Sequence, residues 1–116
     1  MAGGAQLSVT EMRRAARHPV DFPTIGEHRT VGDIKLHISN LSAHGFMVDA
    51  IEVDTPTPAR GDRVIVRLPV IGRIEAYCIW RTGDRAGFQF ERILRLDDFV
   101  GMIEQIQPNS RVRRRG

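Results

Sequence analysis

Between residues 33 and 91 the chain alternates repeatedly between apolar and polar residues, and this period-two pattern limits the folds open to it. Ile34, Leu36 and Ile38 alternate with polar neighbours, which is the pattern of a strand buried on one face. The same alternation recurs in four later segments, at residues 46–50, 63–68, 74–81 and 86–91. The central part of the chain therefore predicts a sheet of half-buried strands.

Residues that favour turns separate these strands. They fall at Gly26–Arg29, Asn40–Gly45, Thr55–Asp62, Ile71–Arg73 and Thr82–Arg85. Short strands joined by such connections favour antiparallel pairing, and closing the sheet into a barrel removes its exposed edges. We therefore expect a small antiparallel barrel of five or six strands.

The segment before the first clear alternation predicts less regular structure. Residues 1–10 show no periodicity, and we expect a flexible N-terminus there. Glu11–His18 is compatible with a helical turn, which Pro19 would end. Val20–Ile25 predicts a short strand of edge type, because Pro23 has no backbone N–H to donate.

Beyond Arg95 the pattern changes to that of a helix. One apolar stripe is formed by Leu96, Phe99, Val100, Ile103 and Ile106. Asp97 and Asp98 lie in the first turn, where the helix dipole favours acids, and Pro108 ends the helix. We expect this helix to cover an open end of the barrel, within one folded domain at residues 11–107. Residues 108–116 predict a basic, disordered tail.

Composition argues against several classes of protein. The 116 residues are 41% hydrophobic and 27% charged, as is ordinary for a globular domain. No run approaches the roughly 20 apolar residues of a membrane-spanning helix, so we expect no membrane insertion. The N-terminus has no apolar segment of the secretory type. A single cysteine, Cys78, indicates a reducing compartment, so we expect a cytoplasmic protein.

Patterns typical of catalysis and metal binding are absent. Ser42 and His44 lie in a turn between strands, without the Gly-x-Ser-x-Gly context of a nucleophile or an acid to orient the histidine. The four histidines are scattered and Cys78 has the phase of a core residue, so no zinc pattern occurs. Trp80 and the phenylalanines at 46, 88, 90 and 99 also have core phase. We expect neither an enzyme nor a bound cofactor.

The basic residues are almost all arginine. Sixteen of the 17 are arginine, and Lys35 is the single lysine. The arginine fork suits phosphates and guanine edges better than a lysine does. Arg13, Arg14 and Arg17 lie just before the first strand, and four more arginines lie at residues 111–115. Arg13 and Arg17 are four apart and can point at one ligand, although a solvated surface arm has the same pattern.

Two motifs in this chain resemble those of the PilZ domain family. That family's signatures are Arg-x-x-x-Arg and Asp/Asn-x-Ser-x-x-Gly. Arg13–Arg17 matches the first and Asn40–Gly45 matches the second, in the family's order. Residues 79–90 resemble the family's last hairpin, and the terminal helix also fits. The resemblance extends over residues 12–107, nearly the whole expected domain.

The resemblance implies a six-stranded antiparallel barrel that binds the bacterial second messenger cyclic di-GMP. Carried over by position, it implies that Arg13 and Arg17 grip guanine edges and phosphates, while Arg14 adds charge or stacks on a base. Asn40 would hydrogen-bond a guanine edge. Ser42 would contact phosphate or hold the turn, and Gly45 would permit a conformation or a close approach that a Cβ blocks. Met12 precedes the first motif, and the ligand stoichiometry stays open.

The resemblance also suggests how a signal is passed on. We expect the N-terminal arm to fold over the barrel when the ligand neutralises its arginines, presenting a new surface to an effector protein. Three alternatives remain. In the first, the domain no longer binds the ligand and binds only a protein. In the second, it is a basic barrel that binds nucleic acid, which we rank lower because its aromatic residues have core phase. In the third, its basic tail docks on an anionic membrane.

Overall fold

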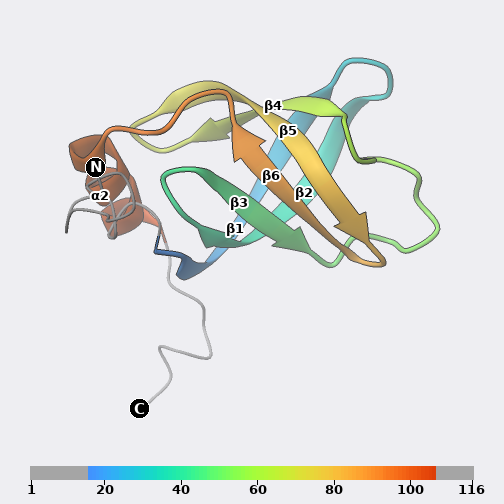
Figure 1. Cartoon of the computed structure of the whole chain (residues 1–116), viewed down its shortest axis with the longest axis horizontal. Coiled ribbons are helices and arrows are strands. Elements are labelled where there is room, and N and C mark those ends of the chain that lie inside the picture. The colour runs from blue at the N-terminus through green and yellow to red at the C-terminus, as the bar shows by residue number, and fades with distance from the viewer. Residues whose placement is uncertain (1–15, 107–116) are drawn as a thin grey trace, which may run out of the picture.

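The computed structural model describes residues 16–106, which form a closed antiparallel barrel with a helix at one end (Figure 1). Its elements are β1 (His18–His28), β2 (Gly32–Leu41), β3 (Gly45–Asp49), β4 (Arg63–Leu68), β5 (Gly72–Thr82), β6 (Arg85–Phe90) and α2 (Leu96–Gln105). The strand order β1-β2-β3-β6-β5-β4 closes because β4 pairs with β1. The predicted six-stranded barrel with a C-terminal helix is confirmed. The predicted arm, with Arg13 and Arg14, and the predicted tail lie outside the described residues.

The inward-facing side chains of all six strands meet in one core. Phe46 of β3 stacks on Phe88 of β6, with ring centroids 4.8 Å apart. Ile38, Val48, Val66 and Ala76 are fully buried, with no exposed surface. The period-two alternation therefore has the physical cause that the sequence suggested, since one face of each strand packs in this core.

β1 is longer than the sequence predicted. It begins at His18, which we expected in a helical turn, and continues to His28, through residues that we expected in a turn. It pairs with β2 along its length, but with β4 only from Gly26 to His28. Pro19 and Pro23 therefore lie where β1 has one neighbouring strand, so their missing N–H groups interrupt no second ladder.

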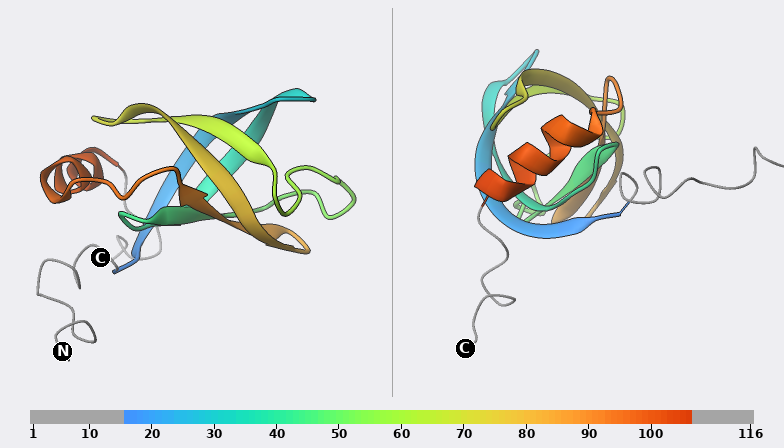
Figure 2. Two further views of the ribbon diagram at one scale, coloured as in Figure 1. Left: turned by 45° about the horizontal axis from the view of Figure 1, so that its top comes forward. Right: turned by 90° about the vertical axis from the view of Figure 1, so that its left-hand side faces the viewer.

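α2 lies across one end of the barrel (Figure 2), as the sequence predicted. Its buried residues, Phe99 and Met102, join the barrel core together with Ile106, which follows the helix. Val100, which the predicted stripe included, is 45% exposed. The helix carries two adjacent apolar rows, and only the row over the barrel opening is buried. The other row borders a groove beside His18.

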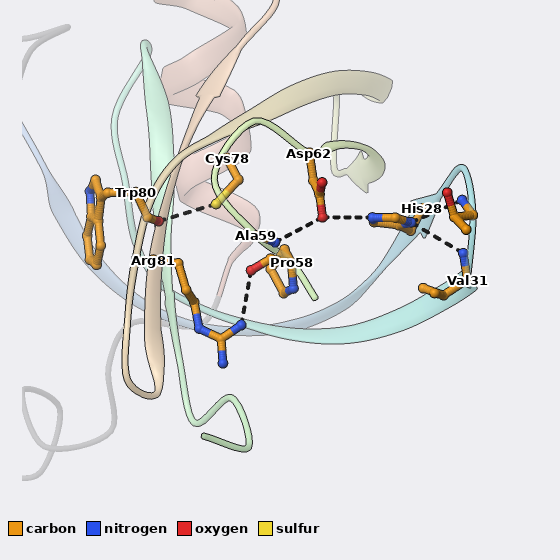
Figure 3. A network of polar contacts seen from close by, with 9 residues as sticks. His28, Val31, Pro58, Ala59, Asp62, Cys78, Trp80 and Arg81 are labelled. Atoms are coloured by element: carbon orange, nitrogen blue, oxygen red, sulfur yellow. Dashed lines mark hydrogen bonds and ion pairs between the residues drawn. The ribbon is translucent and has the colours of Figure 1, made fainter. Parts of the chain in front are cut away.

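A β-bulge in β5 reverses the side on which one predicted core residue lies. The register with β6 shifts between Cys78 and Trp80, so an extra residue separates them. Cys78 is buried as predicted, whereas Trp80 is half-buried and rests against the outer side of Gly87, where a Cβ would overlap the indole nitrogen. In Figure 3 the indole and the Cys78 sulfur point to opposite sides of the strand. The prediction that Trp80 lies in the core is wrong.

Candidate functional site

The segment Asn40–Gly45 connects β2 to β3 and is held by hydrogen bonds of its own. Ser42 is 3% exposed, and its Oγ accepts from the backbone N–H groups of His44 at 3.1 Å and Gly45 at 3.3 Å. The Ser42 N–H donates to the Gly45 carbonyl at 2.9 Å. Of the two roles that the sequence left open for Ser42, this geometry corresponds to holding the turn.

Gly45 is the first residue of β3, at the point where this strand meets β6. A Cβ at this position would overlap the carbonyl oxygen of Phe88 and would lie 3.0 Å from the Cα of Gln89. Both obstacles are backbone atoms, which cannot rotate away as a side chain can. Gly45 therefore permits a close approach of two strands, which is one of the two roles that the resemblance left open for it.

Asn40 projects outward because β2 contains a bulge. The register with β3 shifts between Ile38 and Asn40, which leaves Ser39 and Asn40 both on the outer side of the barrel. The Asn40 Oδ1 accepts a hydrogen bond from Arg17 Nη1 at 3.0 Å. Two motif residues 23 positions apart in sequence are thus in direct contact. The Asn40 Nδ2 lies 3.9 Å from the sulfur of Met47, a weak acceptor, so the amide retains donor capacity.

The Arg17–Asn40 pair lies in a shallow hollow of about 390 Å³ on the outer face of the barrel. We call this the arginine hollow, and its lining residues are Arg17, Pro19, Ser39, Asn40, Met47, Asp49 and Arg85. Both arginines are exposed. Arg85 was missed in the sequence. The alternation along β6 places Arg85 on the opposite face from Phe88 and Phe90, but which residues lie beside it depends on the pairing of β6 with β3.

One outer row of the sheet leads to the hollow. The strand registers place Trp80 beside Gly87, Gly87 beside Met47, and Met47 beside Asn40. The Trp80 indole packs over Gly87, and Met47 lies between Gly87 and the polar Arg17–Asn40 pair in this row. A ligand with both a flat ring and an anionic group fits this arrangement.

The barrel, the turn held by Ser42 and the Arg17–Asn40 contact agree with one family. The model of the PilZ domain family matches residues 11–105, a span that contains both motifs. The chain belongs to the PilZ domain family. PilZ domains are generally modules that bind cyclic di-GMP or act as adaptors, and they are typically not enzymes. No curated protein matches the chain.

A cluster of titratable groups borders the arginine hollow of this PilZ domain. His37 of β2 bonds Asp49 of β3 through Nδ1 at 2.5 Å and Asp21 of β1 through Nε2 at 2.6 Å. The hydrogen bond with Asp49, and then that with Asp21, raises the pKa of His37 above 6.5, although burial partly opposes the shift. The cluster therefore stabilises the fold fully below about pH 6.5, and this contribution is lost as the pH rises through the raised pKa.

A second polar network occupies the end of the barrel away from α2 (Figures 1 and 3). His28 Nδ1 accepts from the backbone N–H of Val31 at 3.3 Å, so its Nε2 carries the proton and donates to Asp62 at 2.9 Å. Burial alone would raise the pKa of Asp62, but hydrogen bonds from the Ala59 amide and His28 outweigh it and lower that pKa. Arg81 donates to the carbonyls of Pro58 at 3.0 Å and Glu52 at 3.2 Å.

This second network fastens the 50–62 loop to the barrel and offers little to a ligand. Asp62 is bonded to both the loop and β1, and Arg81 is used by backbone carbonyls. Burial raises the pKa of the Cys78 thiol nearby, which suits a packing residue rather than a nucleophile. Within residues 16–106 no three His, Cys, Asp or Glu side chains are arranged to hold a metal ion. No helix in that range is long and apolar enough to cross a membrane.

Proposed function

We propose that this PilZ domain binds cyclic di-GMP in the arginine hollow. The observation that carries the proposal is the contact between Arg17 and Asn40, one residue from each motif, on the outer face of the barrel. Arg13 and Arg14 precede Arg17 closely enough for the chain to deliver them to the same ligand. With Arg85 of the hollow, four guanidinium groups then meet a ligand that carries two phosphates and two guanines.

Each part of the ligand has a suitable partner in the hollow or in the outer row that leads to it. The guanidinium groups of Arg17 and Arg85 can fork onto phosphate oxygens or onto the O6 and N7 acceptors of guanine. The Asn40 amide retains its donors for a guanine acceptor. Trp80, in the same outer row, offers an aromatic face on which a base can pack.

Ser42 and Gly45 act on the ligand indirectly in this proposal. Ser42 is buried and satisfied by two backbone N–H groups, so it shapes the turn that follows Asn40. Gly45 lets β3 approach β6, which brings Met47 and Arg85 to the same hollow. Ser42 and Gly45 therefore help to place the other residues that contact the ligand.

The proposed output is an interaction with an effector protein. A ligand held by Arg13 and Arg14 as well as by the hollow would join the N-terminal segment to the barrel face. The resulting composite surface differs from that of either part alone, and such ordering on binding converts ligand concentration into a recognition signal.

Calorimetric titration of the full chain with cyclic di-GMP tests this proposal. We expect binding in the micromolar range or tighter, with much weaker binding of cyclic di-AMP, because adenine lacks the O6 acceptor that the arginines use. A folded protein that binds neither dinucleotide would instead support a PilZ module that recognises only a protein. Tight, steeply salt-dependent binding of a single-stranded oligonucleotide would support the nucleic-acid alternative.

A further inference from the structure

We propose that His37 sets the affinity of the arginine hollow by neutralising Asp49, so that cyclic di-GMP binds more weakly as the pH rises. This inference rests on the function proposed above and adds a regulatory property to the same site. Neither motif contains His37, Asp21 or Asp49.

The geometry connects the cluster to the hollow through one carboxylate. Asp49 lines the arginine hollow and is at the same time bonded to His37 Nδ1 at 2.5 Å. The other ring nitrogen is bonded to Asp21 at 2.6 Å, so the ring bridges two carboxylates. All three side chains are between 34% and 43% exposed, so each can exchange protons with solvent.

Both bonds require the doubly protonated ring. An imidazolium donates from both nitrogens, whereas a neutral imidazole donates from one only, so one carboxylate loses its donor on deprotonation. The cluster then changes from one net negative charge to two. A released Asp49 would repel the ligand phosphates and compete with them for Arg17 and Arg85, the two cations of the hollow.

The charged groups around His37 lie on β1, β2 and β3. Asp21 faces His37 from β1 and Asp49 faces it from β3. Lys35, on the same strand as His37, borders a second hollow with His37 and Asp49. Histidine is the side-chain type whose ordinary pKa lies close to neutral pH, and the phosphodiesters of the ligand stay ionised there.

The direction of the pH effect follows from the sign of the pKa shift. Because both carboxylates raise the pKa of His37, the change in affinity occurs above pH 6.5. The coupling is reciprocal, so the bound ligand must raise the pKa of His37 further. Nuclear magnetic resonance of the His37 ring measures that shift in the wild-type chain, without any substitution.

The decisive experiment measures the dissociation constant for cyclic di-GMP between about pH 6 and about pH 8.5, at constant ionic strength. We expect a total weakening of roughly threefold to thirtyfold in the wild type, the range set by one charge several ångströms from a phosphate. His37→Asn should bind weakly at every pH, and Asp49→Asn should bind tightly at every pH. His18→Asn and His44→Asn serve as matched controls and should keep the wild-type pH dependence.

Each failure has a distinct meaning. Constant wild-type affinity across this range, with binding still lost in Arg17→Ala, would overturn the role of His37 and leave the proposed function intact. Loss of the pH dependence in His18→Asn or His44→Asn, but not in His37→Asn, would also overturn it. If the His37 variant does not fold, an unchanged pKa of His37 on ligand addition to the wild type overturns it equally. Absence of binding at every pH would overturn both proposals.

Discussion

Arg17→Ala is expected to weaken cyclic di-GMP binding by roughly tenfold to a hundredfold, the effect of losing charge-assisted hydrogen bonds to the ligand. Arg17 lines the hollow, is exposed and is bonded to Asn40 at 3.0 Å, so it contributes little to the core. The folded state should therefore be nearly unaffected. Calorimetric titration gives the affinity, and thermal denaturation shows that the variant is folded.

A matched control separates specific contact from general charge. Arg60 is also exposed, but it does not line the arginine hollow, so Arg60→Ala should leave the affinity unchanged. Arg17→Lys keeps the charge but loses the fork, and we expect it to restore only part of the binding. Equal losses in Arg17→Ala and Arg60→Ala would show that net charge, and not the hollow, attracts the ligand.

Gly45→Ala is expected to destabilise the domain by about 1–3 kcal/mol or more, as overpacking in a rigid site does. The added methyl group would overlap the Phe88 carbonyl oxygen, and β3 and β6 would have to move apart. Denaturation with urea should show a lower midpoint than that of the wild type. Cyclic di-GMP affinity should fall as well, because the same shift moves Met47 relative to Arg85.

Gly101→Ala is the matched control for this substitution. Gly101 lies within α2, and a Cβ there would have its nearest neighbour, Val70 Cγ2, at an ordinary 3.7 Å. Because alanine favours a helix more than glycine does, we expect this variant to be more stable by up to about 1 kcal/mol. A Gly45→Ala protein as stable as the wild type would contradict the close approach of β3 and β6.

The parts of the fold that sequence reasoning predicted are those with a local cause. Ile34, Leu36 and Ile38 alternate because one side of β2 packs in the core, and this needs no knowledge of the other strands. The switch to helical spacing after Arg95 is equally local. Both motifs were also visible, since the turn after Asn40 depends on Ser42 accepting from N–H groups within the same segment.

The errors have non-local causes. The prolines of β1 suggested a short edge strand, yet the strand is long because only its last three residues need two partners. Trp80 followed the core phase until a bulge placed it outside, and the apolar run Cys78–Trp80 does not show where the phase shifts. Gly87 makes room for the indole, and this role can be recognised only when the pairing of β5 with β6 is known.

The same limit applies to the candidate site. Arg85 enters the hollow through the pairing of β6 with β3, and His37 gains its partners from strands on either side. A sequence shows neither the strand order nor the register, so it could identify Arg17 and Asn40 from their motifs but not the residues that the barrel places around them. Arg13 and Arg14, at residues outside the described range, stay predictions.

Mapping of backbone amide chemical shifts during titration with cyclic di-GMP tests the central claim most directly, because it reports binding and location together. We predict the largest changes at Asn40, Met47, Asp49 and Gly87, around the arginine hollow, with the amides of the His28–Asp62 network unchanged. Absence of any change at saturating ligand, or the largest changes around His28 and Asp62, would contradict the account.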